Sequence, residues 1–319
     1  MTAPLDRLDG ALFDLSARTK IRVSGTDRQR FLNGQLTNDL RKATETRAVA
    51  ACVLNAKGKM NAHLFVSARA ECFFLDSDPE LRETLQTRLD RYVIADDVQI
   101  EDLSERMSLL HLLSAERPDL PENCTIVSAD RFRKPGWDVW VETAHRNAVF
   151  QQISAASSFC DETCAEVFRI ERGIPRWRRE LTEEIIPVEA GLEESCVDYE
   201  KGCYIGQEVI SRMKISGQRN KTLCGLIALD EGPFDAGMKL FSAASENRVA
   251  GWVTSTARSE RFGKKIGLGY VKRPFNQIGA ELGAFSSNGT SSSERGRVKV
   301  SVLPFALEES ELVDRFRPR

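Results

Sequence analysis

Residues 200–208 of this 319-residue chain read EKGCYIGQE, which combines a thiol, an amine, two carboxylates and two glycines. Lys201 stands two residues before Cys203, where its charge would favour the thiolate, and a helix that begins near Gly206 would act in the same direction. Glycine suits positions where the backbone needs a positive φ or passes close to a ligand. The stretch is therefore typical of a reactive or ligand-lining cysteine beside a site for an anion.

A purely structural interpretation competes with this one. The same residues also fit a glycine-rich turn with a half-buried cysteine and a solvated basic helix end, because short motifs often match by chance. A cysteine nucleophile needs a general base, and the three histidines, His63, His111 and His145, are all distant in sequence. Both interpretations stay open on these residues alone, and a cysteine–histidine hydrolase has little support.

Composition narrows the classes of function. The chain is 41% hydrophobic and 29% charged, with a formal net charge of −2, so general nucleic-acid binding is not expected. The first residues lack the apolar run of a secretory signal, and the apolar run at 48–54 is too short to span a bilayer. We therefore expect a cytoplasmic protein with no membrane partner.

The eight cysteines are scattered and contain no CxxC motif. In a chain of this length without a secretory signal, this pattern predicts reduced thiols. Cys160 and Cys164 would share one face of a helix as buried cysteines. With so few histidines, and none of them near this pair in sequence, no stably bound metal is expected.

Hydrophobic periodicity predicts the elements that position the 200–208 stretch. Strands are expected at 20–25, 48–53, 60–67, 71–76 and 136–142, a turn at 55–58, and helices at 26–40, 79–93 and 147–172. After residue 221, short strands punctuated by glycines predict a small all-β barrel or sandwich. The fold class is therefore α+β, with residues 1–221 as one region and 222–319 as a barrel domain.

The segment Lys201-Gly-Cys-Tyr-Ile-Gly-Gln-Glu208 resembles the K-G-C-[YF]-x-G-Q-E signature of the YgfZ-type folate-binding proteins, which are relatives of the glycine-cleavage T-protein. The signature residues are Lys201, Gly202, Cys203, Tyr204, Gly206, Gln207 and Glu208. Further blocks follow in the family's order at 23–25, 31–39, 55–60, 169–175 and 187–192. The resemblance spans about residues 15–225. It implies a T-protein-like multi-domain ring with a C-terminal barrel, two interleaved subdomains in the first region (the inner one at about 46–122), and tetrahydrofolate as the ligand.

The resemblance also implies roles for individual residues. Cys203 and Lys201 are the candidate catalytic residues. The candidate folate-binding residues are Asp138, Trp137, Tyr204, Gln207, Glu208 and Arg212. Asp138 would accept the amino and ring N–H groups of the pterin. Ala165 stands where T-proteins carry a folate-contacting arginine, so that contact is lost.

The largest departure from the T-protein pattern lies in the hairpin after Gly58. T-proteins carry an acidic pair there, and this chain has Ala62-His63. A general acid or base typically contributes about 10²–10⁴-fold to a rate. The resemblance therefore implies that this chain is not a typical aminomethyltransferase.

Three functions follow as hypotheses. The resemblance implies a tetrahydrofolate-binding accessory protein that supports assembly or repair of iron–sulfur enzymes, with iron–sulfur client or assembly proteins as partners. The first alternative is a folate-dependent aminomethyl- or methyltransferase that uses another acid. The second is a non-catalytic module whose basic segment 212–221 docks a protein or RNA, and the net charge of the chain fits this one least.

Overall fold

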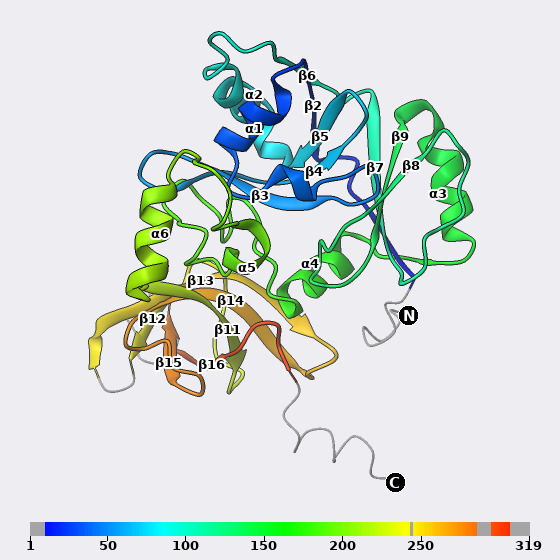
Figure 1. The fold of residues 1–319 in the computed structure, drawn as a ribbon. Helices are drawn as coiled ribbons and strands as arrows, with labels where there is room; N and C mark the ends of the chain where they lie inside the picture. The colour runs from blue at the N-terminus through cyan, green and yellow to red at the C-terminus, as the bar shows by residue number, and fades with distance from the viewer. Residues whose placement is uncertain (1–9, 243–244, 286–294, 307–319) are drawn as a thin grey trace. The chain divides into compact units, whose positions relative to one another are not determined.

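The computed structural model describes residues 10–242, 245–285 and 295–306 (Figure 1). Contacts within the chain divide it into two compact units. We call the unit of residues 7–165 and 176–218 the α/β unit, and the unit of residues 1–6, 166–175 and 219–319 the barrel unit. The domain boundaries expected from the sequence stay predictions.

In its described residues, the α/β unit contains two five-stranded sheets. The first has the order β3-β4-β5-β2-β6, and its strands are β2 (Thr19–Ser24), β3 (Val49–Leu54), β4 (Met60–Ala68), β5 (Cys72–Ser77) and β6 (Gln99–Asp102). The second has the order β10-β1-β7-β9-β8, and its strands are β1 (Ala11–Asp14), β7 (Met107–Leu113), β8 (Thr125–Ser128), β9 (Trp137–Glu142) and β10 (Ser158–Phe159). Neighbouring strands are antiparallel except β1 and β10. The apolar patterns predicted five of these ten strands, β2, β3, β4, β5 and β9, to within a residue or two.

The helices of the described residues are short. They are α1 (Arg28–Gln35), α2 (Arg82–Asp90), α3 (Arg146–Ser154), α4 (Glu162–Glu171), α5 (Glu193–Cys196) and α6 (Gln207–Ser216), with single 3₁₀ turns at Leu40–Lys42, Pro79–Leu81 and Thr143–His145. Val149 and Ile153 of α3 bury their side chains against Leu110, Val139 and Val141 of the second sheet. This packing follows from their helical spacing of four residues.

Two predicted helices differ from the observed ones. The helix expected over 26–40 ends at Gln35, because the next residues turn extended and Leu36 pairs with Val53 as an isolated β-bridge. The helix expected over 147–172 is two helices, α3 and α4, separated by β10, which pairs with β1. In both cases pairing with a distant strand overrides the local helical preference.

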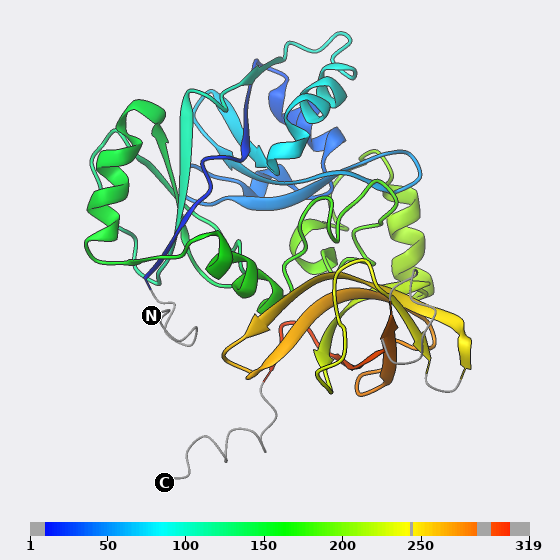
Figure 2. The same ribbon diagram turned by 180° about the vertical axis from the view of Figure 1, so that it is seen from behind.

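The barrel unit contains a closed six-stranded antiparallel barrel of order β11-β14-β13-β12-β15-β16 (Figure 2). Its strands are β11 (Lys221–Ala228), β12 (Lys239–Ser242), β13 (Ser245–Ser259), β14 (Lys264–Lys272), β15 (Glu281–Phe285) and β16 (Gly296–Ser301). A Cβ atom on Gly251 would lie 2.0 Å from the Tyr270 carbonyl oxygen, so glycine is required where β13 and β14 approach closely. The small all-β barrel expected from the sequence is confirmed.

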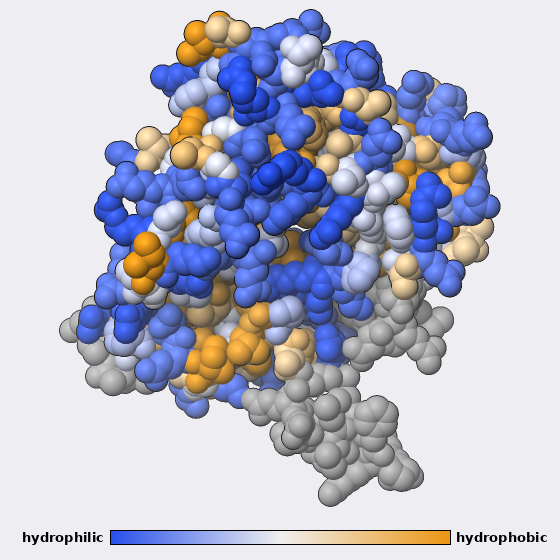
Figure 3. All heavy atoms as spheres, viewed as in Figure 1, coloured by the Kyte–Doolittle hydropathy of each residue, from blue (hydrophilic) through white to orange (hydrophobic). Residues whose placement is uncertain are grey.

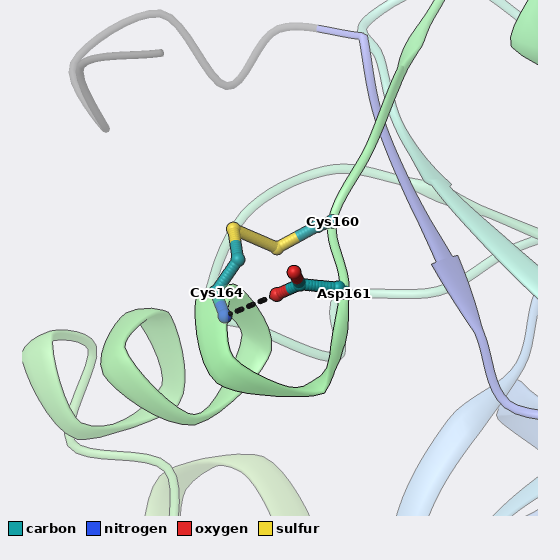
Figure 4. The surroundings of a disulfide bond; sticks show 3 residues. All are labelled: Cys160, Asp161 and Cys164. Atoms are coloured by element: carbon teal, nitrogen blue, oxygen red, sulfur yellow. Dashed lines mark hydrogen bonds between the residues drawn. A yellow bond between two sulfur atoms is a disulfide. The ribbon is translucent and has the colours of Figure 1, made fainter. Parts of the chain in front are cut away.

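Cys160 and Cys164 form a disulfide bond, with Cα atoms 5.4 Å apart (Figure 4). Cys160 lies just before α4 and Cys164 in its first turn, where the Cys164 N–H donates to the Asp161 carboxylate at 2.8 Å. This side-chain cap holds the two thiols within bonding range. The prediction that both residues are reduced cysteines on one helical face is therefore wrong for this pair.

The described surface is mostly hydrophilic. On the face in Figure 3, hydrophilic side chains cover most of the described surface and apolar ones form small groups. Ile94 and Ile215 are the most exposed of the described large apolar residues, at 88% each. Within the described ranges, no helix has the length and hydropathy needed to cross a membrane.

Candidate functional site

Two glycines allow the signature loop, residues 201–208, to pack closely against the β3–β4 hairpin. Gly206 has φ of 87° at the start of α6, and a Cβ there would lie 2.6 Å from the Asn55 carbonyl oxygen. Gly58 has φ of 72°, and a Cβ there would lie 2.8 Å from the Val209 side chain. Residues with a Cβ fit neither the positive φ nor the space. The N-terminus of α6 is therefore held directly against the hairpin turn.

Lys201 is buried and its ammonium group binds the backbone. The Lys201 Nζ donates to three carbonyl oxygens, those of Asn33 at 2.8 Å, Leu36 at 2.7 Å and Asn38 at 2.8 Å. Burial lowers the pKa of Lys201 to about 8. Because an ammonium group has three N–H donors, these bonds use all of them. The contacts give Lys201 a structural role in holding the segment after α1, and its predicted effect on the Cys203 thiol stays a prediction.

Cys203 and Tyr204 are neighbours in sequence with opposite exposure. Cys203 is exposed, and a Cβ on the preceding Gly202 would meet nothing within 4 Å. Tyr204 is only 7% exposed, its ring centroid lies 5.3 Å from the Lys201 Nζ, and its hydroxyl is a buried group without a hydrogen-bond partner in the described structure. Burial raises the pKa of Tyr204 to about 12. The loop thus presents a thiol outward and a phenol inward.

The remaining signature residues begin α6. Gln207 and Glu208 form its first turn, and the Glu208 carboxylate pairs with Arg212 one turn later at 2.6 Å. Both side chains of this pair are largely exposed, at 83% and 74%, so the pair contributes little to stability. Both charges therefore stay accessible to a ligand or partner, while Ile210 anchors the helix with a fully buried side chain.

Asp138 is buried on β9, and both of its oxygens already accept hydrogen bonds. Its Oδ1 lies 2.8 Å from the His111 Nδ1 and 2.6 Å from the Arg131 Nε, and its Oδ2 lies 2.7 Å from the Arg131 Nη2. Burial alone would raise the pKa of Asp138, but Arg131 and His111 hold it at about 2. Trp137 beside it is half-buried. The oxygens expected to receive the pterin thus have protein donors in this structure, and the folate contact stays a prediction.

Arg131 links the two sheets of the α/β unit. Besides Asp138 on β9, its guanidinium donates to both oxygens of Asp76 on β5 at 3.0 and 2.6 Å. Its central carbon lies 4.2 Å from the Phe65 ring centroid. Sequence reasoning did not identify Arg131, Asp76 or His111 as neighbours of Asp138. The available signal was a histidine inside the apolar strand MSLLHLL, where an ionisable group needs a partner.

Ala62 and His63, which stand where T-proteins carry an acidic pair, lie on β4. Ala62 is fully buried, and His63 is half-buried and directly opposite Cys52 of β3 in the antiparallel register. No cluster of three or more His, Cys, Asp or Glu side chains in the described ranges could hold a metal ion.

Two family models match this chain in the expected order. The GCVT N-terminal domain matches residues 7–134, and the glycine cleavage T-protein C-terminal barrel domain matches residues 221–305. The chain belongs to the glycine-cleavage T-protein superfamily. The second match covers the closed barrel, and the first covers the hairpin that receives the signature loop.

Individual T-protein superfamily members align over most of this chain. The aminomethyltransferase of Desulforamulus reducens is 24% identical over 316 residues, which cover 88% of this chain and 84% of that protein. The aminomethyltransferase of Bacillus subtilis is 24% identical over 308 residues, covering 86% and 82%. A putative chloroplastic transferase of Arabidopsis thaliana is 25% identical over 304 residues, covering 86% and 68%.

A solved T-protein structure confirms the fold. The crystal structure of glycine cleavage system aminomethyltransferase T from Bartonella henselae superposes with a TM-score of 0.80 at 18% sequence identity, covering 93% of this chain and 86% of that chain. At this identity the likeness shows the fold alone. The YgfZ-type assignment within the superfamily remains a proposal.

Proposed function

We propose that this chain is a tetrahydrofolate-dependent protein of the aminomethyltransferase type. The joint match of the T-protein N-terminal and barrel domains carries this proposal, together with relatives named aminomethyltransferase that align over 84% and 82% of their own length. Asp138, Trp137, Tyr204, Gln207, Glu208 and Arg212 are the proposed folate-binding residues. For Asp138 to receive a pterin, the ligand must replace at least one hydrogen bond from Arg131 or His111.

The acid–base group for a transfer reaction must differ from that of a T-protein with an acidic pair. Ala62 cannot exchange a proton, so His63 is the titratable side chain at that hairpin position. A histidine can serve as a general acid or base near neutral pH. We therefore expect slow transfer that depends on His63.

Binding and turnover can be measured separately. The protein is titrated with reduced tetrahydrofolate in a calorimeter, and is then incubated with tetrahydrofolate and aminomethyl donors while methylene- and methyl-tetrahydrofolate are quantified. Asp138→Asn should weaken binding, whereas Asp102→Asn on β6, whose carboxylate pairs with Arg82 near the surface, should not. Failure of the wild type to bind tetrahydrofolate at millimolar concentration would refute the proposal.

One observation favours a second function, a folate-binding accessory role in iron–sulfur enzyme assembly or repair. Cys203 is an exposed thiol in the signature loop, while the acidic pair expected for aminomethyl transfer is replaced. Under this alternative, tetrahydrofolate binds without turnover, and cells with defective iron–sulfur enzymes are rescued by the wild type and by Cys72→Ser but not by Cys203→Ser. Full rescue by Cys203→Ser would remove the role of the thiol.

A further inference from the structure

A second group of thiols lies in the α/β unit and is fully buried. Cys52 on β3 and Cys196 at the end of α5 both have 0% exposure. The antiparallel register places Cys52 directly opposite His63 of β4, so the two side chains share one face of the sheet. The Cys196 sulfur lies 3.3 Å from the Ser195 Oγ, and Cys52, His63 and Ser195 all act on the pKa of the Cys196 thiol.

The backbone around the two cysteines is held by one buried threonine. The Thr37 hydroxyl donates to the Cys196 carbonyl oxygen at 2.6 Å and accepts from the Cys52 N–H at 2.8 Å. The Thr37 N–H donates in turn to the Cys52 carbonyl oxygen at 3.0 Å. Because one residue bonds both backbones, Cys52 and Cys196 are held close together without a covalent link.

The surroundings shift the pKa values of the two thiols in opposite directions. Burial raises the pKa of Cys52. The hydrogen bond from Cys52 holds the pKa of Cys196 below its usual range despite burial, and the charge and hydrogen bond of His63 add to this effect. Cys196 is therefore the more acidic thiol of the pair.

We propose that Cys196 and Cys52 form a hydroperoxide-responsive dithiol, in which Cys196 is oxidised first and Cys52 converts the product to a disulfide. The adjacency of the thiols, the neighbouring His63 and the complete burial carry this inference. A buried pair is closed to a bulky disulfide such as oxidised glutathione, whereas hydrogen peroxide is little larger than water. The inference is independent of folate binding and of Cys203.

The chemistry balances without a further co-reactant. The Cys196 sulfur attacks one peroxide oxygen, the O–O bond breaks, and the leaving hydroxide takes the proton that Cys196 gives up to become water. This gives a sulfenic acid on Cys196. The Cys52 sulfur then attacks the Cys196 sulfur, and the sulfenic OH leaves with the Cys52 proton as a second water. The two thiols lose two electrons, and one peroxide becomes two waters.

The test is peptide mapping after oxidation. The protein is fully reduced, exposed to hydrogen peroxide, alkylated and digested, and the linked Cys52–Cys196 peptide is quantified by mass spectrometry. We expect this peptide in the wild type and equally in Cys203→Ser. His63→Asn should slow its formation at least about tenfold, because Cys196 loses a neighbour that lowers its pKa. In Cys52→Ser, Cys196 should instead be trapped as a sulfenic acid by dimedone.

Controls separate this reaction from oxidation of unfolded chains. Cys224 is a buried thiol in the barrel, where burial raises its pKa to about 11, and it should stay unmodified. Oxidised glutathione should yield no linked peptide. Each of three results would overturn the proposal: no Cys52–Cys196 peptide in the wild type, equal yields with glutathione, or a rate that rises with sub-denaturing urea. The measurements on the wild-type protein test the proposal even if a variant fails to fold.

Discussion

Replacing Arg131 with methionine tests whether the buried charge network holds the α/β unit together. Arg131 makes four hydrogen bonds of 2.6 to 3.0 Å to two carboxylates, Asp76 and Asp138, which are 1% exposed each. Removing one partner of a buried ion pair costs about 3–5 kcal/mol, because the other charge is left uncompensated. Asp76 keeps its ion pair with Arg18, whereas Asp138 is left with His111 as its side-chain partner, so we expect a loss within this range.

The loss should depend on pH in a defined direction. In the wild type the pKa of Asp138 is about 2, against an ordinary value of 3.8, so its contribution to stability is present above 3.8 and is lost as the pH falls towards 2. Without Arg131, burial raises the pKa of Asp138 above its unfolded value. The folded variant then binds more protons than the unfolded chain, and its stability falls as the pH rises through this window. The variant should therefore lose more at about pH 7 than at about pH 4.5.

Urea unfolding followed by tryptophan fluorescence measures this effect, since Trp137 and Trp140 lie on the same strand as Asp138. Arg82→Met is the matched control. Arg82 also pairs with two carboxylates but is 41% exposed, so its loss should stay within about 1 kcal/mol. The reasoning is refuted if Arg131→Met costs no more than Arg82→Met, or if its cost is the same at both pH values.

Three further predictions concern the signature loop and its support. Lys201→Met should lower the free energy of unfolding in urea by about 2–4 kcal/mol, because three carbonyl oxygens lose their donor. The control Lys42→Met, whose side chain is 56% exposed, should lower it by at most about 1 kcal/mol. Similar losses in the two variants would contradict the structural role of Lys201. Gly206→Ala should lower thermal stability by about 2–4 kcal/mol, through its positive φ and a carbonyl oxygen 2.6 Å from the new Cβ. Gly202→Ala, with open space around it, should change it by less than about 0.5 kcal/mol, and the reverse order would show that the loop lies elsewhere. Thr37→Val should lower the free energy of unfolding by about 1–3 kcal/mol in calorimetry, since the Cys52 N–H and the Cys196 carbonyl lose their hydroxyl partner. An unchanged melting temperature would contradict this role of the Thr37 hydroxyl.

Four strands of the first sheet, and the β-barrel character of the region after residue 221, were predictable because their signal is local. The predicted strands at 48–53, 60–67 and 71–76 lie within one or two residues of β3, β4 and β5, since their apolar residues stand together in short stretches of chain. The turn at 55–58 was also predictable, because Gly58 has the positive φ that the turn requires.

The partners of the functional side chains were decided by tertiary structure. Lys201 donates to carbonyl oxygens at the end of α1 and in the segment after it, and its effect on the Cys203 thiol stays a prediction. The helix expected through residue 40 ends at Gln35, where this ammonium and Thr37 hold the chain extended. A buried ammonium group needs hydrogen-bond acceptors around it. The sequence does not show which carbonyl groups from distant parts of the chain will lie beside it.

By itself the sequence determined the fold class, the barrel and the superfamily, because periodicity, glycine positions and ordered motifs are written within short stretches of chain. Only the tertiary structure decided that Arg131 neutralises Asp76 and Asp138, and that Cys196 lies against Cys52 and His63. Charges and thiols take their properties from the groups packed around them. Those groups come from strands and helices far apart in the chain, and folding alone brings them together.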